Sequence, residues 1–171
     1  FDQDALKILK RKKNLRLIDA SNFTFSETLK FTSTNDNILV QSEDKKNFKK
    51  SDFKIVSKKK PSISLFNDLI FAFNICRYVK SNAIVLASNK STLGIGCGQT
   101  SRLDSCQIAI DKMKKFTKPS KDIVAASDAF FPFIDGIEKL VQSGVKAVIQ
   151  PAGSIKDKEV INFANETGTI L

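Results

Sequence analysis

The sequence predicts an α/β protein whose sheet is mixed but largely parallel in the second half of the chain. Two observations lead to this prediction. After Pro61, short apolar runs of strand length alternate with longer segments in which apolar residues recur every three or four positions. The first two of these strands follow each other directly, which favours a hairpin, whereas helices separate the later strands, which favours parallel crossovers.

The residues before Pro61 are less regular and more basic than the rest. Residues 21–37 are mostly polar and are expected to be irregular. A short helix and three strands are expected around them: residues 3–12, then 15–18, 38–41 and 53–56. A lysine run and Pro61 interrupt the pattern, so we place a subdomain boundary there. This divides the chain into a variable basic part, residues 1–61, and a regular subdomain, residues 62–171.

The elements after Pro61 follow from their spacing. Ile63, Phe66 and Leu69 begin a helical repeat that predicts a buried helix to about Lys80, with Ser62 as one candidate cap. Two short strands joined by a turn then form the expected hairpin, residues 83–87 and 92–95. The remaining elements are expected as helix 101–116, strand 123–126, helix 134–143, strand 145–149, helix 156–166 and the start of a strand at 169–171.

The composition limits the classes of function. The chain of 171 residues has 28 Lys and Arg against 18 Asp and Glu, a formal charge of +10, but its lysine runs are typical of solvated loops rather than of a nucleic-acid surface. Neither a stretch of about 20 apolar residues nor a signal peptide is visible. We therefore expect a soluble, cytoplasmic protein that binds neither nucleic acid nor membrane.

The chain has no histidine and three cysteines. The lack of histidine excludes Ser-His-Asp and Cys-His catalysis and the usual histidine-ligated metal site within these residues. Cys76 and Cys106 lie in apolar helical segments and are expected in the core, as thiols of a reducing compartment. Cys97 lies in a glycine-rich turn, where it is either a small residue that the turn tolerates or a ligand contact.

Two loops carry the candidate binding chemistry. In the first, Gly96 and Gly98 follow a strand, where positive φ angles would let backbone N–H groups approach an anion, and Arg102 opens the next helix. By its spacing alone this segment also fits a plain tight turn, because it matches neither the Walker A nor the GxGxxG pattern. The second loop, residues 127–133 (SDAFFPF), also follows a strand.

The phenylalanines of the second loop offer flat faces for a heteroaromatic ring, and Asp128 or Asp135 can accept hydrogen bonds from ring amines. The alternative is that these phenylalanines belong to the core and that Asp135 caps the next helix. A third strand-end loop, residues 150–154, brings Ser154 as a cap or a ligand contact. Because ligands of open α/β sheets bind at the carboxyl ends of the strands, the three loops are expected to converge on one pocket.

Four ordered motifs resemble a known family. They are KSNAIV (80–85), GxGxGQxSR (94–102), SDAFFPFxDG (127–136) and AVIQPxGS (147–154). Together they closely resemble the bifunctional enzymes of purine biosynthesis that join AICAR transformylase to IMP cyclohydrolase. The resemblance is dense from Asp68 to Leu171 and looser over residues 1–60. It implies the C-terminal part of the transformylase region, with a cytidine-deaminase-like three-layer α/β/α architecture.

The resemblance also implies an activity. The family transfers a formyl group from 10-formyltetrahydrofolate, a co-substrate, to AICAR, and its upstream cyclohydrolase domain closes the ring to IMP. It works as a homodimer with the transformylase site at the dimer interface. The zinc ligands of deaminases, H-x-E and PCxxC, are absent from this sequence, so no metal is implied.

By motif position, the resemblance assigns residues to two ligands. The nucleotide contacts are Asn82, Arg102 and, in a region that matches less closely, Asp19. The folate contacts are Leu103, Phe130, Asp135, Ser154 and Ile155.

The catalytic Lys-His pair of the family lies upstream of the matching residues, and this chain contains no histidine. We therefore expect part of a longer enzyme that, alone, binds without catalysing. Two alternatives stay open. One is a non-catalytic basic module for a nucleotide or nucleic acid, and the other is a structural subdomain without a complete pocket.

Overall fold

The computed structural model describes the chain except for residues 25–28, 45, 47 and 117–120. The chain divides into two compact units, Phe1–Lys46 and Asn47–Leu171, which are described separately. In the described part of the chain, no helix combines the length and the apolar character that crossing a membrane requires.

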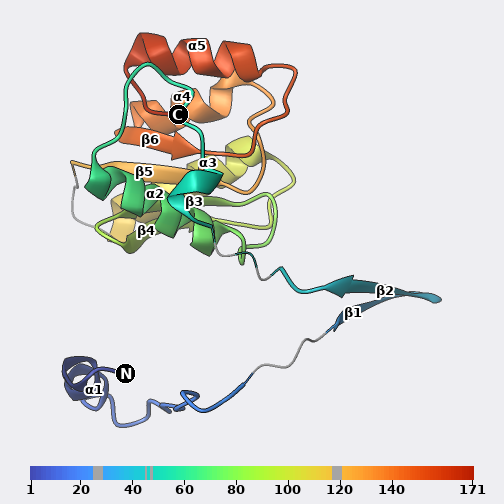
Figure 1. Cartoon of the computed structure of the whole chain (residues 1–171), viewed down its shortest axis with the longest axis vertical. Coiled ribbons are helices and arrows are strands. Elements are labelled where there is room, and N and C mark those ends of the chain that lie inside the picture. Colours follow the sequence, from blue (N-terminus) through green and yellow to red (C-terminus); the bar gives the residue numbers. More distant parts are fainter. Residues whose placement is uncertain (25–28, 45, 47, 117–120) are drawn as a thin grey trace. The chain divides into compact units, whose positions relative to one another are not determined.

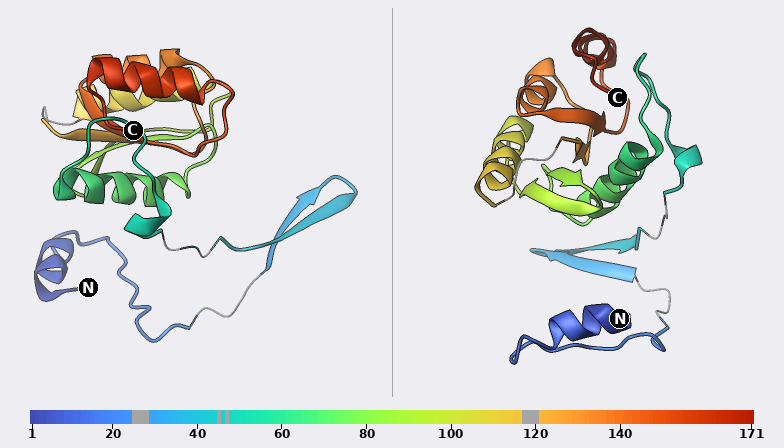
Figure 2. Two further views of the ribbon diagram at one scale, coloured as in Figure 1. Left: turned by 45° about the horizontal axis from the view of Figure 1, so that its top comes forward. Right: turned by 90° about the vertical axis from the view of Figure 1, so that its left-hand side faces the viewer.

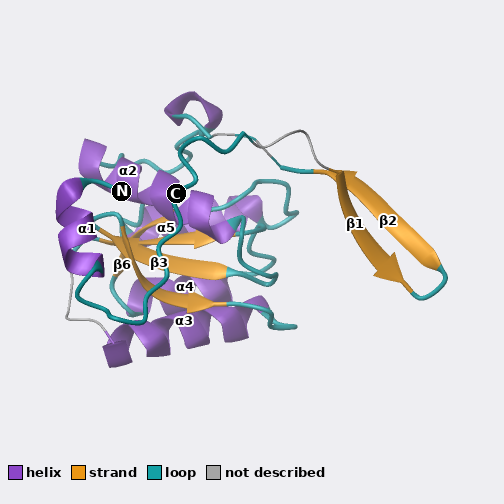
Figure 3. Cartoon of the chain, turned by 90° about the horizontal axis from the view of Figure 1, so that it is seen from below, coloured by secondary structure: helices purple, strands orange, loops and turns teal. Residues whose placement is uncertain are grey.

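The first unit contains a short helix and a hairpin. Helix α1 (Gln3–Leu9) is capped by the Asp2 carboxylate, which accepts a hydrogen bond from the backbone N–H of Ala5 at 2.6 Å. Strands β1 (Leu29–Thr34) and β2 (Asn37–Ser42) pair antiparallel as a two-stranded ribbon (Figure 3).

Two expectations for the first unit were wrong. Residues 15–18 form no strand, and residues 29–34, expected to be irregular, form β1. The polar residues of β1 concealed it, because both strands of the ribbon are exposed along their whole length and need no regular apolar face. Residues 25–28 of the same expectation lie outside the described residues.

The second unit is built on a four-stranded mixed sheet in the order β4-β3-β5-β6. Its strands are β3 (Ile84–Ser88), β4 (Ser91–Gly96), β5 (Ile123–Ser127) and β6 (Val145–Ile149). Strand β3 is antiparallel to both of its neighbours, and only β5 and β6 form a parallel pair. The sheet is thus mixed, as predicted, with an antiparallel hairpin first and parallel pairing between the later strands, but the antiparallel pairing of β3 with β5 was not expected. Strands β4, β5 and β6 do point the same way, yet β3 lies between β4 and β5.

Helices cover both faces of this sheet. Helix α2 (Ile63–Cys76) lies on one face, whereas α3 (Arg102–Phe116) and α4 (Ile134–Gln142) lie on the other (Figures 1 and 2). Helix α5 (Asp157–Thr167) packs against α4 and adds Val160 to the core on that side. All five helices and strands expected between residues 101 and 166 are present, with ends that differ by no more than one residue. The three layers agree with the prediction, and the more specific cytidine-deaminase-like fold stays a prediction.

Residues 48–61 belong to the second unit, so the observed division lies upstream of the expected boundary at Pro61. The backbone N–H groups of Val56 and Ser57 both donate to the carbonyl of Leu171, at 2.9 and 3.2 Å. The N–H of Leu171 donates in turn to the Ser57 hydroxyl at 2.9 Å. These bonds tie the segment to the end of the chain without forming the strand expected at 53–56, and Ile170 makes a single parallel bridge to Ala147.

Candidate ligand-binding site

Three loops and one strand start meet at the same edge of the sheet. Strands β4, β5 and β6 end there, and each is followed by a loop that leads into α3, α4 or α5. Because β3 runs in the opposite direction, its beginning lies at this edge, and the residues just before it, including Asn82, join the loops. The predicted convergence of the strand-end loops is thus observed, with an additional segment that the parallel arrangement did not suggest.

A pocket of about 530 Å³ lies at this edge, between the beginnings of α3 and α4. It brings together five of the eight residues predicted from the sequence: Asn82, Arg102, Leu103, Phe130 and Asp135. Its wall is completed by Thr100, Ser101, Ala129, Phe131, Pro132, Phe133 and Gly136. Residues as far apart in the sequence as Asn82 and Asp135 therefore share one cavity.

The other three predicted residues do not line this pocket. The Ser154 hydroxyl accepts a hydrogen bond from the N–H of Lys156 at 3.0 Å, just before α5, as a local turn contact. Ile155 is 99% exposed. Asp19 belongs to the first unit, where its carboxylate accepts hydrogen bonds from the Ser21 hydroxyl and N–H, which lower the pKa of Asp19.

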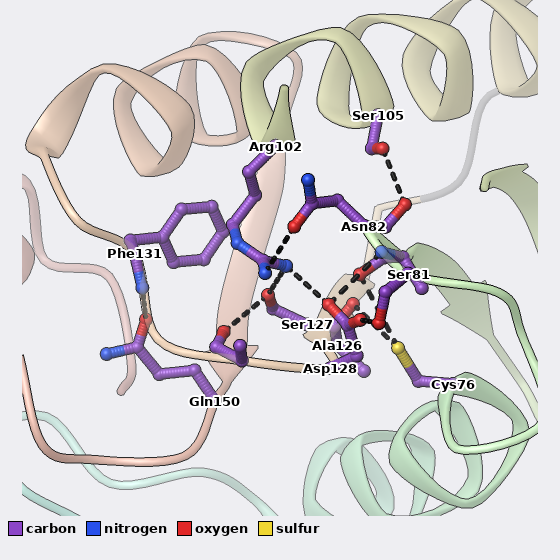
Figure 4. A network of polar contacts seen from close by, with 12 residues as sticks. Cys76, Ser81, Asn82, Arg102, Ser105, Ala126, Ser127, Asp128, Phe131 and Gln150 are labelled. Atoms are coloured by element: carbon purple, nitrogen blue, oxygen red, sulfur yellow. Dashed lines mark hydrogen bonds and ion pairs between the residues drawn. The ribbon is translucent and has the colours of Figure 1, made fainter. Parts of the chain in front are cut away.

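The guanidinium of Arg102 is the centre of a polar network beside the pocket (Figure 4). Its Nη1 donates to the hydroxyl of Ser127 at 2.9 Å and to Oδ1 of Asp128 at 2.5 Å, and its Nη2 donates to Oδ1 of Asn82 at 2.8 Å. The side chains of Arg102 and Asp128 are only 11% and 13% exposed. Each charge is thus compensated by the other, which a mostly buried ion pair requires.

The side chain of Asn82 is held from both ends. Its Nδ2 donates to the carbonyls of Gln99 and Thr100, at 2.9 and 3.0 Å, and the backbone carbonyl of Asn82 accepts from the Ser105 hydroxyl at 2.7 Å. With both N–H bonds of the amide in use, Oδ1 must face Arg102. The loop before α3 therefore fixes the orientation of Asn82.

The carboxylate of Asp128 is occupied by protein groups rather than open to a ligand. Besides Arg102, it accepts hydrogen bonds from the N–H of Ala83 at 3.1 Å and from the hydroxyl of Ser81. Burial by itself raises the pKa of Asp128, but the hydrogen bonds from Ser81, Arg102 and Ala83 and the charge of Arg102 outweigh burial and lower it. Of the two aspartates considered from the sequence, only Asp135 lines the pocket.

The phenylalanines divide between core and pocket. Phe131 is 1% exposed and packs in the core beneath α4, whereas Phe130 and Phe133 are 38% and 61% exposed. The N–H of Phe131 donates to the side chain of Gln150 at 3.0 Å, which ties the loop after β5 to the loop after β6. The core alternative is therefore right for Phe131, while ring binding by Phe130 and Phe133 stays a prediction. Asp135 does not cap the next helix, because the N-cap of α4 is Phe133 and no side chain caps it with a hydrogen bond.

The glycines of the first loop differ from their expected role. Gly98 has a positive φ of 67°, as expected, but Gly96 is the last residue of β4 and is outside the left-handed region. The reason for glycine at this position is the close approach of α3. The expectation of a positive φ was therefore wrong for Gly96, and anion binding by this loop stays a prediction.

The two cysteines that were expected in the core are found there. Cys76 and Cys106 are buried, and burial raises the pKa of each thiol to about 12. Cys97 is exposed. Within the described ranges, no group of three or more Asp, Glu or Cys residues is placed to hold a metal ion.

Sequence reasoning missed three polar residues that hold the site together: Ser81, Ser127 and Gln150. Each lies inside a motif, but the partner that it binds across the site lies in another loop. Of the three, only Ser127 carries a signal in the sequence, its position at the end of a strand.

Fold and site together define an α/β protein with a pocket at the strand ends, between the beginnings of two helices. A sequence model of the family described as AICARFT/IMPCHase bienzyme matches residues 1–112. The chain therefore belongs to the AICARFT/IMPCHase bienzyme family.

Full-length relatives support this membership. The chain is 44% identical over 173 residues to a protein of Persephonella marina and 44% identical over 171 residues to one of Aquifex aeolicus, both named "Bifunctional purine biosynthesis protein PurH". It is 41% identical over 171 residues to the protein of that name from Neisseria meningitidis. Each comparison covers all of this chain and 32% to 33% of the relative, so the chain spans about a third of the length of these relatives.

Proposed function

We propose that this chain forms a substrate-binding part of an enzyme that transfers a formyl group from 10-formyltetrahydrofolate to AICAR in purine biosynthesis. One observation carries the proposal: five residues assigned to the two ligands from the sequence line a single pocket. The parent enzyme would also close the ring to IMP, in agreement with the description of the family as an AICARFT/IMPCHase bienzyme.

Arg102 and Asn82 form the ribotide side of the proposed site. In the described structure, the Nε–H of Arg102 has no hydrogen-bond partner, although its Nη atoms are engaged. An Arg102 held in this way offers a fixed donor to an acceptor atom of AICAR, and Asn82 lies beside it on the pocket wall. Asp19 is a further proposed nucleotide contact.

Leu103, Phe130 and Asp135 form the folate side. Phe130 presents a partly exposed ring to which a pterin or aminobenzoyl ring can stack, and the Asp135 carboxylate can accept hydrogen bonds from pterin N–H groups. Ser154 and Ile155, in the loop after β6, are proposed to contact the same ligand. The full exposure of Ile155 suits a residue that becomes buried when a ligand or another part of the enzyme binds.

The residues of this chain are proposed to bind and orient the ligands rather than to move protons. Without histidine, the chain has none of the residue type most used for acid-base catalysis near neutral pH. The general base and the other half of the site would come from the remainder of the parent enzyme and from a second subunit of a homodimer.

Calorimetric titration of the full chain with AICAR and with a folate analogue tests the proposal. Arg102→Lys removes the Nε–H donor and the Nη atoms that hold it in place, so it should weaken AICAR binding by about tenfold or more, while Asp135→Asn should weaken only the folate analogue. Arg11→Lys, a change at an exposed arginine of the first unit, is the matched control. Binding of neither ligand would contradict the proposal. Salt-sensitive RNA binding instead would favour a basic binding module.

A further inference from the structure

The carboxylate of Asp128 joins two parts of the chain that carry proposed ligand contacts. Its Oδ1 accepts from Arg102, at the beginning of α3, and from the N–H of Ala83, next to Asn82. Its Oδ2 accepts from the hydroxyl of Ser81, on the other side of Asn82. The backbone N–H of Asp128 also donates to the carbonyl of Ala83, at 3.3 Å.

Asp128 lies next to residues of the pocket wall but does not line the pocket itself. It does not belong to the pocket wall, whereas Asn82 and Arg102 do. Its side chain is 13% exposed, and its oxygens accept hydrogen bonds from three protein donors. A ligand in the pocket would therefore meet the donor and acceptor atoms that Asp128 holds in place, and not Asp128 itself.

We propose that Asp128 is a positioning residue that fixes Arg102 and the segment containing Asn82 in their binding arrangement before the ribotide arrives. This inference rests on the proposed function. Arg102 has a long, flexible side chain, and ordering it only upon binding would weaken affinity. The ion pair with Asp128 and the bonds to Ser127 and Asn82 supply that order in advance.

The negative charge of Asp128 is central to this role. A guanidinium that is 11% exposed would be unfavourable without a counter-charge. Asp128→Asn has nearly the same shape: its oxygen can still accept from Arg102 and Ala83, and its amide can donate to the Ser81 hydroxyl. This variant therefore removes the charge while leaving the hydrogen-bond pattern possible, which separates charge from shape.

The first experiment observes Arg102 directly in the full chain without ligand. In a ¹⁵N NMR spectrum, the Nε–H signal of Arg102, assigned by its loss in Arg102→Gln, should be as rigid as the backbone. In Asp128→Asn it should become mobile, while in the control Asp111→Asn, an exposed residue of α3, it should not change. An Arg102 signal that is already mobile in the unaltered chain overturns the inference, and this result needs no variant to fold.

The second experiment is a double-mutant cycle on AICAR affinity, measured by calorimetry. Asp128→Asn should weaken AICAR binding by about tenfold. Because Asp128 would act through Arg102, the double variant Arg102→Gln, Asp128→Asn should bind no worse than Arg102→Gln alone. Fully additive losses would overturn the inference. If the unaltered chain does not bind AICAR, the proposed function fails, while the NMR result still decides whether Asp128 orders Arg102.

Discussion

Gly96 of β4 lies so close to Ser105 of α3 that a Cβ on the glycine would be 1.9 Å from the Ser105 carbonyl oxygen. Two residues earlier, Gly94 approaches Ala109 in the same way, with a Cβ distance of 2.0 Å to the carbonyl oxygen. Helix α3 thus packs directly on β4. This contact fixes the distance between the sheet and Arg102, the first residue of the helix.

Gly96→Ala should lower the free energy of unfolding by about 3 kcal/mol or more, because backbone atoms of α3 cannot move aside as a flexible side chain would. Urea denaturation followed by circular dichroism measures the change. Gly98→Ala is the matched control: its Cβ meets nothing within 4 Å, and its positive φ alone should cost about 1 kcal/mol. Equal losses in the two variants would contradict the close-approach explanation.

Asp68 of α2 stabilises the turn between β3 and β4. Its two carboxylate oxygens accept hydrogen bonds from the N–H groups of Asn89 and Lys90, both at 2.8 Å, and both of these turn residues have positive φ angles. Asp68→Ala should lower the free energy of unfolding by about 2 kcal/mol, since two N–H groups lose their partner.

Lys90→Gly provides the opposite test at the same turn. Glycine adopts positive φ without strain, so this change should stabilise the chain by about 0.5 kcal/mol. Thermal or urea unfolding would show both effects, and a stabilising Asp68→Ala would refute the role given to the carboxylate.

The ion pair of Asp128 predicts a pH dependence of stability. Because the folded pKa of Asp128 lies below its ordinary value of 3.8, the stabilisation is fully present above the unfolded pKa and is lost as the pH falls through the folded pKa. The difference in unfolding free energy between the unaltered chain and Asp128→Asn should be constant from about pH 5 to 7 and shrink below about pH 4. A difference that does not vary with pH would argue against the charge.

The thiols should differ sharply in reactivity. At pH 7.5 a thiol reagent should modify Cys97 in the folded chain, because it is exposed, but spare Cys76 and Cys106, whose pKa of about 12 leaves almost no thiolate. Colorimetric titration should count one reactive thiol in the native chain and all three in urea. Rapid native modification of a buried cysteine would mean that the core opens readily.

The chain by itself should show no formyl transfer, even if it binds AICAR, since it contains no histidine to act as a base. Spectrophotometric detection of tetrahydrofolate release would test this, with the full-length Aquifex aeolicus relative as the assay control. A rate close to that of the full-length protein would require a different assignment of roles.

Most of the second unit could be predicted because its helices and strands carry their own signals. The helices keep an apolar period, as at Leu65, Leu69 and Ala72, and the buried strands are short apolar runs such as Ile123–Ser127. The place of β3 in the sheet could not be predicted in this way. Strand order depends on which faces the helices cover, and no local pattern shows that β3 separates β4 from β5.

The candidate site, like the fold, could be predicted only in part. Arg102, Phe130 and Asp135 follow strands in recognisable motifs, so their convergence could be expected. The partner of Arg102 could not, because the contact with Asp128 exists only once the loops after β4 and β5 meet beside the start of β3. For the same reason Asp128 was considered as a ligand contact, although its oxygens are occupied by protein donors.

The reversed direction of β3 has a consequence for strand alignment. A slip of β3 by one residue against β5 would carry Asn82 away from Arg102 and turn the side chains of β3 to the opposite face. If Asn82 and Arg102 hold a ligand as proposed, binding requires the correct alignment of β3. A molecule with a misaligned sheet would then be unable to bind, and the ligand would select correctly aligned molecules from any mixture.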